Sequence, residues 1–288
     1  TDNPLDWHQV NFFENAFSED IGNILFGKGR SSDSASLVSP DNTANGNLKK
    51  KWKIIGGKRV LLKDSSTPYR QEAYNEVLAS EIAKRLGISH VPYTLIPEYG
   101  EICSGCEDFI TPKTDLVAAA QVMSAFKKRN EQSEYELYIE CCETLGIADA
   151  RKKLEQMLVL DYLIVNEDRH LNNFGLIRNA VTLEWIGTAP LYDNGNSMWF
   201  NRITGEMHAG DDSNIKTPLR KKNPTENLAL VTDFSWLNLS TLDGIEDYAR
   251  ELYGKSEYLE PVRIETLANA LRTRIELLGG IARGQAIL

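Results

Sequence analysis

Short apolar runs dominate the first third of the chain, whereas apolar residues at helical spacing dominate the rest. The short runs predict four strands, at residues 51–55, 58–63, 91–99 and 101–110. Gly56 and Gly57 stand between the first two runs, as in a tight hairpin turn. Between the second and third runs, residues 69–87 carry one apolar helical face and end at Gly87, which predicts a helix with a glycine cap.

From Thr114 onward the pattern predicts mainly helices. They are expected over residues 133–145, 148–165 and 264–281. Residues 174–178 and 182–186 predict one small hairpin. The pattern therefore predicts an α+β fold, with a strand-rich part up to about residue 112 and a helical part after it.

Residues 27–47 interrupt this pattern. They follow a short helix predicted within residues 7–26, are rich in Gly, Ser, Asp and Asn, and have almost no large apolar side chain. Loops of this length inside compact domains are more often functional than accidental. A functional loop is therefore expected just before the first strand.

The overall composition narrows the class of protein. The chain has 288 residues, of which 42% are hydrophobic and 25% charged, as in a soluble globular protein. Its net charge of -9 disfavours direct binding to nucleic acid. No apolar run reaches the ~20 residues of a membrane helix. The N-terminus shows no secretory pattern, which favours the cytoplasm, although the absence of a first Met leaves a processed signal open.

Four cysteines add one alternative. Cys103 and Cys106 form a CxxC that is half of a zinc site, but Cys141 and Cys142 are adjacent and poorly spaced to complete it. Small buried thiols are therefore the favoured interpretation, and reduced cysteines are typical of the cytoplasm.

A dense polar segment carries the candidate chemistry. NEDRHLNNFG, residues 166–175, follows directly on an apolar run. Within it Asp168 and Asn173 are five residues apart, and Asp193 follows the predicted hairpin. Asp and Asn oxygens are ligands that Mg²⁺ prefers, and phosphoryl transfer also needs a carboxylate that orients the attacking hydroxyl. Protein kinases meet both needs with this order and spacing.

Phosphoryl transfer also needs a cation at the phosphates. Lys63 ends a predicted strand and suits this role, and Glu76 is preferred to Glu72 as its partner because it neighbours buried residues. Each of these side chains alone also has an ordinary explanation as a solvated surface residue. Arg169 and His170 are interpreted as structural supports of the loop rather than as a base. The order and spacing of the whole set favour a site.

Four segments together resemble the HipA-type serine/threonine kinases of bacteria, the toxin kinases of persistence modules. They are SPDNTANGNLKKKW (39–52), NEVLASEIAKRLGI (75–88), NEDRHLNNFG (166–175) and PLYDNGNS (190–197). The resemblance implies a two-lobed protein-kinase-like fold, with an N-lobe over residues 1–112 and a helical C-lobe over 113–288. It also implies ATP and Mg²⁺ as cofactors, a protein Ser or Thr as substrate, autophosphorylation, and in two-component modules an antitoxin partner.

The resemblance assigns roles to single residues. Asp168 is the implied catalytic aspartate, and Asn173 and Asp193 are the implied Mg²⁺ ligands. Lys63 is the implied lysine at the ATP phosphates.

Further roles fall on the hinge and on the phosphate loop. The hinge, whose backbone is implied to meet adenine, contains Glu107, Phe109 and Ile110. Gly46 is the single central glycine of the implied phosphate loop, where many kinases have several. Candidates for regulatory autophosphorylation in that loop are Ser36, Ser39 and Thr43.

Two alternatives stay open. The catalytic loop also resembles that of phosphoinositide kinases, which would act at a membrane and use basic residues near the substrate. The candidates for such a patch are Lys216, Arg220, Lys221 and Lys222. An ATP-binding pseudokinase or interaction module is the second alternative, and the presence of the lysine, both aspartates and the asparagine speaks against it.

Overall fold

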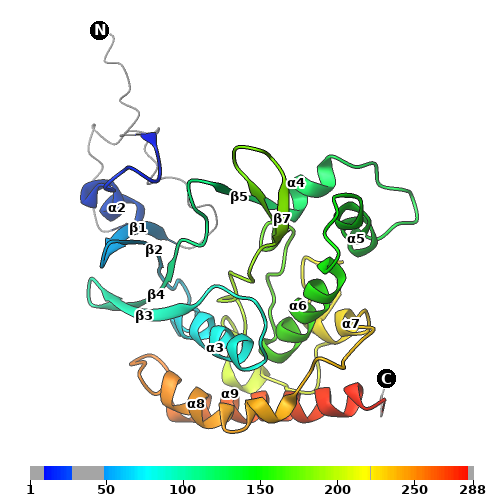
Figure 1. Cartoon of the computed structure of the whole chain (residues 1–288). Coiled ribbons are helices and arrows are strands. Elements are labelled where there is room, and N and C mark those ends of the chain that lie inside the picture. Colours follow the sequence, from blue (N-terminus) through cyan, green and yellow to red (C-terminus); the bar gives the residue numbers. More distant parts are fainter. Residues whose placement is uncertain (1–9, 28–48, 221, 285–288) are drawn as a thin grey trace.

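A four-stranded antiparallel sheet forms the first part of the protein (Figure 1). In the computed structural model, which describes residues 10–27, 49–220 and 222–284, its strands lie in the order β1-β2-β4-β3. Their bounds are β1 Lys50–Ile55, β2 Lys58–Lys63, β3 Tyr93–Glu98 and β4 Glu101–Glu107. Gly56 and Gly57 have φ angles of 57° and 79°, which glycine adopts without strain, and the predicted tight turn joins β1 to β2.

One helix covers each face of this sheet (Figure 1). On the outer face, after α2 (Glu19–Leu25), Phe26 packs against the buried side chains of Val60, Leu62 and Cys103. On the other face α3 (Glu72–Arg85) packs against β3 and β4. As predicted, α3 is followed by Gly87. Its φ of 67° is a left-handed conformation that glycine adopts readily because it has no Cβ atom.

The second part of the protein is mainly helical and contains one small sheet. Its helices are α4 Ala119–Ser124, α5 Glu134–Thr144, α6 Ala150–Ile164, α7 Pro224–Leu228, α8 Ile245–Tyr253 and α9 Pro261–Ala282, with single 3-10 turns at Thr204–Glu206 and Leu239–Leu242. Its antiparallel sheet has the order β5-β6-β7, with bounds β5 Thr114–Ala118, β6 Gly175–Asn179 and β7 Trp185–Thr188. The hairpin of β6 and β7 was predicted, whereas β5 lies where the sequence predicted helical structure.

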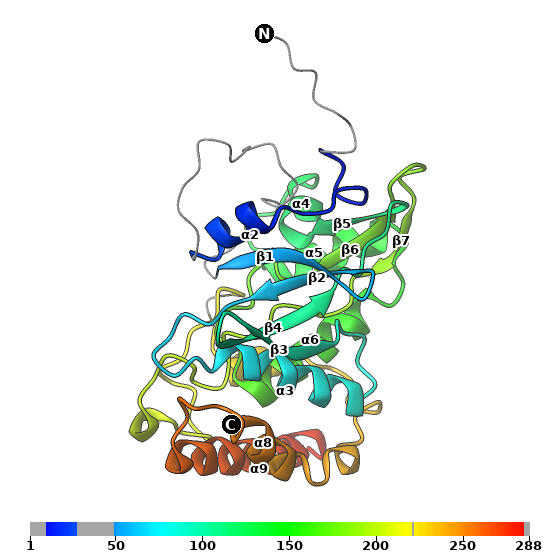
Figure 2. The same ribbon diagram turned by 90° about the vertical axis from the view of Figure 1, so that its left-hand side faces the viewer.

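α6 is the centre of this second part. Twelve of its fifteen residues are buried, which explains the apolar run that precedes the polar loop. α8 and α9 lie side by side below α3 and pack against α3 and α6 (Figure 2). The predicted α+β fold, with a strand-rich first part and a mainly helical second part, is thus the observed one. None of the helices in the described ranges is long and apolar enough to cross a membrane.

Candidate active site

The polar loop of residues 166–173 begins where α6 is stopped abruptly. Val165 caps α6 with a φ of 51° and a ψ of 55°, a left-handed conformation that β-branched residues rarely adopt. Backbone strain of this kind costs about 1–3 kcal/mol and persists only where the surrounding structure enforces it. The end of the buried helix α6 therefore fixes the position at which the loop of residues 166–173 begins.

Hydrogen bonds fix Asp168 within the loop. Its N–H donates to Oδ1 of Asn166 at 2.9 Å, and Nδ2 of Asn173 donates to its carbonyl oxygen at 3.0 Å. Nδ2 of Asn196 donates to Oδ2 of Asp168 at 2.9 Å. Among the described residues no hydrogen bond engages Oδ1, so the geometry leaves this oxygen open to a further donor.

Arg169 ties the loop to α6 and to the segment around Asp193. Its buried guanidinium forms an ion pair with Asp161 of α6 at 2.8 Å and donates to Oδ1 of Asn194 at 2.6 Å. It also donates to the carbonyl oxygens of Asn173 and Tyr192, at 2.9 and 3.0 Å. These contacts connect the loop to residues 192–194 and hold both segments in register.

His170 is half-buried and belongs to the loop rather than to the hydrophobic core. Its Nδ1 accepts the backbone N–H of Asn172 at 3.2 Å, and the backbone N–H of His170 donates to the carbonyl oxygen of Asp168 at 2.8 Å. These contacts are local, so they stabilise the turn of the loop and suggest no base in this position.

Lys63 stands at the centre of a buried charge cluster. Its Nζ lies 2.7 Å from Oε1 of Glu76 and 2.7 Å from Oδ1 of Asp193, and it donates to the hydroxyl of Tyr93 at 3.1 Å. The structure brings Glu76, and not Glu72, to this lysine, because Glu72 instead accepts hydrogen bonds from residues 66–67. The other oxygen of Glu76 accepts the N–H of Asn194 at 2.8 Å. Strand β2, helix α3 and the segment after β7 thus meet at one ammonium group.

The charges of this cluster support one another. Burial lowers the pKa of the Lys63 ammonium, but the carboxylates of Asp193 and Glu76 outweigh it and hold that pKa well above its ordinary value. Burial raises the pKa of Asp193, yet Lys63 and then Lys50 hold it well below its usual range. Lys63 is therefore cationic and Asp193 anionic at neutral pH.

The backbone around Asp193 is strained. Asp193 has a φ of 60°, and Met198 and Trp199, a few residues later, both have a φ of 52°. These are left-handed conformations in residues other than glycine, and such strain concentrates at functional sites. The side chain of Asp193 remains 28% exposed, so a ligand can reach it.

The predicted hinge is partly engaged with its own neighbours. Glu107 forms an ion pair with Lys58 at 2.6 Å, and the N–H of Ile110 donates to Oδ1 of Asp108 at 3.1 Å. The ring of Phe109 lies 5.6 Å from the ring of Tyr192. Through this contact the segment after β4 lies next to the residues that precede Asp193.

Several sequence predictions fall elsewhere. Gly46, Ser36, Ser39, Thr43 and Lys221 lie outside the described residues.

All four cysteines are buried free thiols, and the described ranges contain no group of three or more His, Cys, Asp or Glu side chains placed to hold a metal. In the basic cluster of the alternative reading, Lys222 pairs with Glu226 at 2.8 Å.

The donor set fits Mg²⁺ and a triphosphate. Asp193 offers a partly exposed carboxylate, which is a hard oxygen ligand. Because the Nδ2 of Asn173 is committed to Asp168, the amide oxygen of Asn173 is the atom left to bind a cation. Lys63 is a cation of the kind that a phosphate requires.

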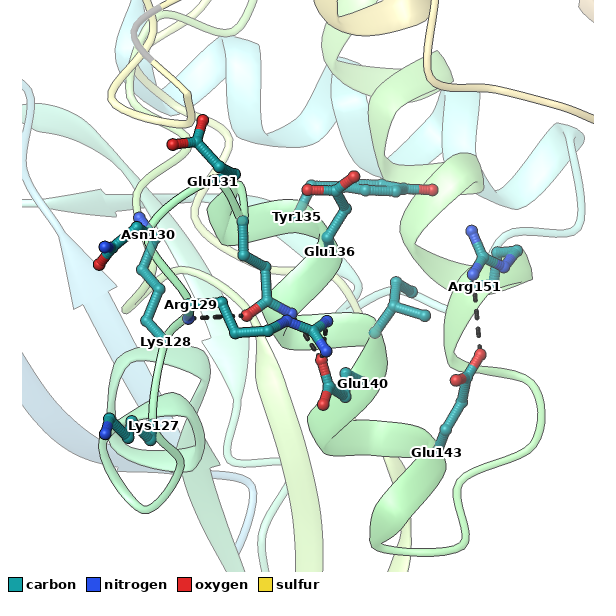
Figure 3. A pocket seen from close by; sticks show the side chains of 12 residues that line it. Lys127, Lys128, Arg129, Asn130, Glu131, Tyr135, Glu136, Glu140, Glu143 and Arg151 are labelled. Carbon is teal, nitrogen blue, oxygen red and sulfur yellow. Dashed lines mark hydrogen bonds and ion pairs between the residues drawn. The ribbon is translucent and has the colours of Figure 1, made fainter.

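A broad hollow lies away from this cluster, between the loop after α4, helix α5 and the start of α6 (Figure 3). It has a volume of about 1050 Å³. Its charges have both signs, and two pairs of them are ion pairs: Arg129 with Glu140 at 2.7 Å and Arg151 with Glu143 at 3.7 Å. The hollow therefore defines no ligand and is not part of the candidate active site.

The sequence missed three residues of the site. Tyr93 and Asn196 contact Lys63 and Asp168, and Nζ of Lys50 lies 3.9 Å from Oδ2 of Asp193. Lys50 had a readable signal, because counting outward from Gly56 and Gly57 places it opposite Lys63 in the hairpin. Tyr93 had none, since its position follows from the pairing of β3 with β4.

A sheet that carries a buried lysine–glutamate pair, followed by helices that present a polar loop to that pair, defines a protein of kinase-like fold. Within that class the chain belongs to the HipA family, because the family model for the HipA-like C-terminal domain matches residues 43–255. No curated protein sequence matches the chain significantly.

Solved structures share the fold as well. The proinflammatory kinase CtkA of Helicobacter pylori is 16% identical, with a TM-score of 0.61 over 83% of this chain and 95% of CtkA. HipA of Shewanella oneidensis MR-1, solved with HipB and operator DNA of a toxin–antitoxin system, is 16% identical, with a TM-score of 0.52 over 93% of this chain and 72% of that HipA chain. At this identity the likeness concerns the fold.

Proposed function

We propose that this protein is an ATP- and Mg²⁺-dependent serine/threonine protein kinase of the HipA-like type that phosphorylates itself. The observation that carries the proposal is the meeting of Lys63, Glu76 and Asp193 at distances of 2.7 Å. Membership of the HipA family and the kinase fold support it. ATP as substrate and four buried thiols suit an enzyme of the cytoplasm.

The residues of the site divide the work of phosphoryl transfer. Glu76 holds Lys63, and Lys63 holds the phosphates of ATP. Asp193 and the amide oxygen of Asn173 hold Mg²⁺, which when bound neutralises charge on the phosphate oxygens. The hinge residues Glu107, Phe109 and Ile110 hold adenine.

Asp168 acts on the attacking group. Its Oδ1 orients a serine or threonine hydroxyl, whose oxygen bonds to the γ-phosphorus while the bond from that phosphorus to the bridging oxygen of ADP breaks. The hydroxyl proton passes to Asp168. Because Asn166, Asn173 and Asn196 fix this aspartate beforehand, positioning supplies a large part of the rate.

Mass spectrometry after incubation with ATP and Mg²⁺ tests the proposal. The wild type is expected to gain phosphate on Ser or Thr, with Ser36, Ser39 and Thr43 as the first peptides to inspect. Asp168→Asn is expected to gain none and to unfold at a similar temperature. Asp247→Asn is the matched control, because the side chain of Asp247 is 81% exposed on α8.

The outcomes separate the alternatives. Equal phosphorylation of the wild type and Asp168→Asn would refute the assignment of Asp168. A wild type that binds ATP but gains no phosphate points to a phosphoinositide substrate, which lipid vesicles with labelled ATP would reveal. Binding without any transfer is the result expected of a pseudokinase. An antitoxin partner, proposed from the likeness to HipA, is tested separately by purification with the product of a neighbouring gene.

A further inference from the structure

Tyr93, the first residue of β3, is held firmly beside the charge cluster. The residue is only 5% exposed. It lies directly opposite Cys106 in the pairing of β3 with β4, and its backbone N–H donates to Oγ of Ser80 on α3 at 3.3 Å. A buried side chain that is fixed to a strand and a helix in this way has little freedom to move. The hydroxyl of Tyr93 is therefore a fixed point next to Lys63.

This hydroxyl accepts hydrogen bonds from two parts of the candidate site. Nζ of Lys63 donates to it at 3.1 Å, and the backbone N–H of Asp193 donates to it at 3.4 Å. The ammonium group of Lys63 also lies 5.1 Å from the centre of the tyrosine ring, within the range of a cation–π interaction. Tyr93 thus joins strand β2 to the strained backbone at Asp193.

Lys63 has no donor to spare in this arrangement. An ammonium group has three N–H donors. Its three acceptors are Oε1 of Glu76 at 2.7 Å, Oδ1 of Asp193 at 2.7 Å and the Tyr93 hydroxyl at 3.1 Å. A phosphate can therefore receive an N–H from Lys63 only after one of these acceptors has left it.

Asp193 is the acceptor that is able to leave. Glu76 is 2% exposed, and its second oxygen accepts the N–H of Asn194, so both of its oxygens are engaged. Tyr93 is fixed by its strand and by α3. The side chain of Asp193 is 28% exposed, and its carboxylate is a ligand of the kind that Mg²⁺ prefers. The release of Lys63 by Asp193 is thus linked to the binding of a metal by Asp193.

We propose that Tyr93 is a positioning residue that makes the binding of ATP depend on Mg²⁺. Because its hydroxyl occupies one donor of Lys63, the lysine cannot offer an N–H to a phosphate while the carboxylate of Asp193 stays in place. Because the same hydroxyl accepts the N–H of Asp193, the backbone stays in position when that carboxylate turns to a metal. The inference rests on the proposed function and deepens it, since it assigns a residue that links the metal to the nucleotide.

Tyr93→Phe tests this, because it removes the hydroxyl and keeps the ring beside Lys63. One N–H of Lys63 is then free without a metal, so ATP in EDTA is expected to bind about 3–10-fold more tightly than to the wild type, the range for one hydrogen bond. With Mg²⁺ the affinity should stay within about twofold. Titration calorimetry of the full chain with ATP, in EDTA and in Mg²⁺, measures both affinities. A mere loss of packing would not raise an affinity.

Tyr74→Phe is the matched control. Tyr74 is 2% exposed on α3, and its hydroxyl donates to the carbonyl oxygen of Lys255 at 3.3 Å. The variant loses one buried hydroxyl without changing the acceptors of Lys63, so its ratio of ATP affinities with and without Mg²⁺ should match that of the wild type. An equal change of this ratio in Tyr74→Phe and Tyr93→Phe would show a general loosening around α3 and overturn the proposal.

The remaining outcomes are distinct. Mg²⁺ also binds ATP directly, so the decisive quantity is the change of the affinity ratio between Tyr93→Phe and the wild type. An unchanged ratio would overturn the role of Tyr93 and leave the proposed kinase intact. Equal weakening with and without Mg²⁺ would show a purely structural role and also overturn it. A wild type that binds no ATP with Mg²⁺ would overturn the proposed function itself. Thermal unfolding of each variant checks the fold, and Tyr93→Met replaces Tyr93→Phe if that variant does not fold.

Discussion

Arg169 shows how one side chain can hold a catalytic loop in place. Its guanidinium is almost fully buried and contacts Asp161, Asn194 and the carbonyl oxygens of residues 173 and 192. A planar fork of donors can satisfy all of these acceptors, whereas a lysine ammonium cannot. The loop geometry therefore depends on the shape of this residue as well as on its charge.

Arg169→Lys is expected to lower the free energy of unfolding by about 2–4 kcal/mol, because it leaves buried acceptors without donors. Urea denaturation followed by circular dichroism measures this. Arg178→Lys is the control, since Arg178 also pairs with a carboxylate, that of Asp115, but both side chains are a third or more exposed. That change should cost less than about 1 kcal/mol. Similar losses of unfolding free energy in Arg169→Lys and Arg178→Lys would show that the buried guanidinium of Arg169 contributes no more to stability than an exposed one.

The charge of Asp193 gives a prediction about pH. Its pKa is held well below the ordinary value in the folded state, mainly by Lys63 against the effect of burial. A carboxyl group with a lowered folded pKa stabilises the protein above its unfolded pKa, about 3.9, and loses that contribution as the pH falls through the folded value. The stabilisation is therefore complete at neutral pH and fades in acid.

Asp193→Asn is accordingly expected to be less stable than the wild type at pH 7, with a difference that shrinks steadily below about pH 4. Urea denaturation at several pH values measures the two curves. Glu76 works in the opposite sense, because burial raises its pKa although Lys63 opposes this, so the total stability of the wild type is a poorer readout. A difference that does not vary between pH 7 and pH 3 would contradict the assignment of charge at Asp193.

At the scale of elements, α3 is fastened to the second part of the protein. Nδ2 of Asn75 donates to the carbonyl oxygens of Gly195 and Ser197 at 2.9 and 2.7 Å, and its Oδ1 accepts the hydroxyl of Tyr253 at 2.8 Å. The preceding Gln71 accepts from the guanidinium of Arg263 on α9. The helix that carries Glu76 therefore has fixed partners on α8, on α9 and in the segment after Asp193.

Asn75→Leu tests this attachment. The substitution keeps the approximate volume but removes a partner of two carbonyl oxygens, one hydroxyl and the side-chain amide of Gln71, so a loss of about 3 kcal/mol or more is expected. Tyr253→Phe removes one hydrogen bond alone and should cost about 1 kcal/mol. Thermal and urea denaturation measure both variants. A loss in Asn75→Leu no larger than that in Tyr253→Phe would show that the contacts to residues 195 and 197 add little.

The elements also show what the sequence could and could not predict. The hairpin at Gly56 and Gly57, the helix before Gly87 and the two long helices before the polar loop were predicted, because each depends on local spacing. β5 was not, since its five residues are all half-buried and pair with β6 about sixty positions later. The pairing of Lys63 with Glu76 was predicted from neighbouring burial, but the contact of Lys63 with Tyr93 depends on the register of distant strands. Long-range pairing leaves no periodic trace in the chain.

At the scale of the whole molecule, the two parts share one hydrophobic core. Buried residues of α3, such as Leu78 and Ile82, belong to the same cluster as Leu163 of α6 and Leu271 of α9. The smaller cluster around Phe26 lies on the outer face of the sheet. The boundary near residue 112, which stays a prediction, divides the sequence at a point where packing is continuous, so a separate unfolding of the first part would have to open the common core.

One cooperative unfolding transition is therefore expected for the full chain, and ATP with Mg²⁺ should raise its midpoint. A ligand at one hundred times its Kd adds about 2.7 kcal/mol to the folded state, and in a chain of this size each kcal/mol shifts the midpoint by about 2–4 °C. Differential scanning calorimetry measures both quantities. The ratio of calorimetric to van't Hoff enthalpy reports whether unfolding is a single transition, and the change in midpoint temperature reports ligand binding. Asp193→Asn is the paired variant, and its shift with ATP and Mg²⁺ should be smaller. Two separate transitions in the wild type would mean that the charge cluster and the contacts of α3 fail to couple the two parts of the protein. The contact between Lys63 and Asp193 would then form only when ATP is bound.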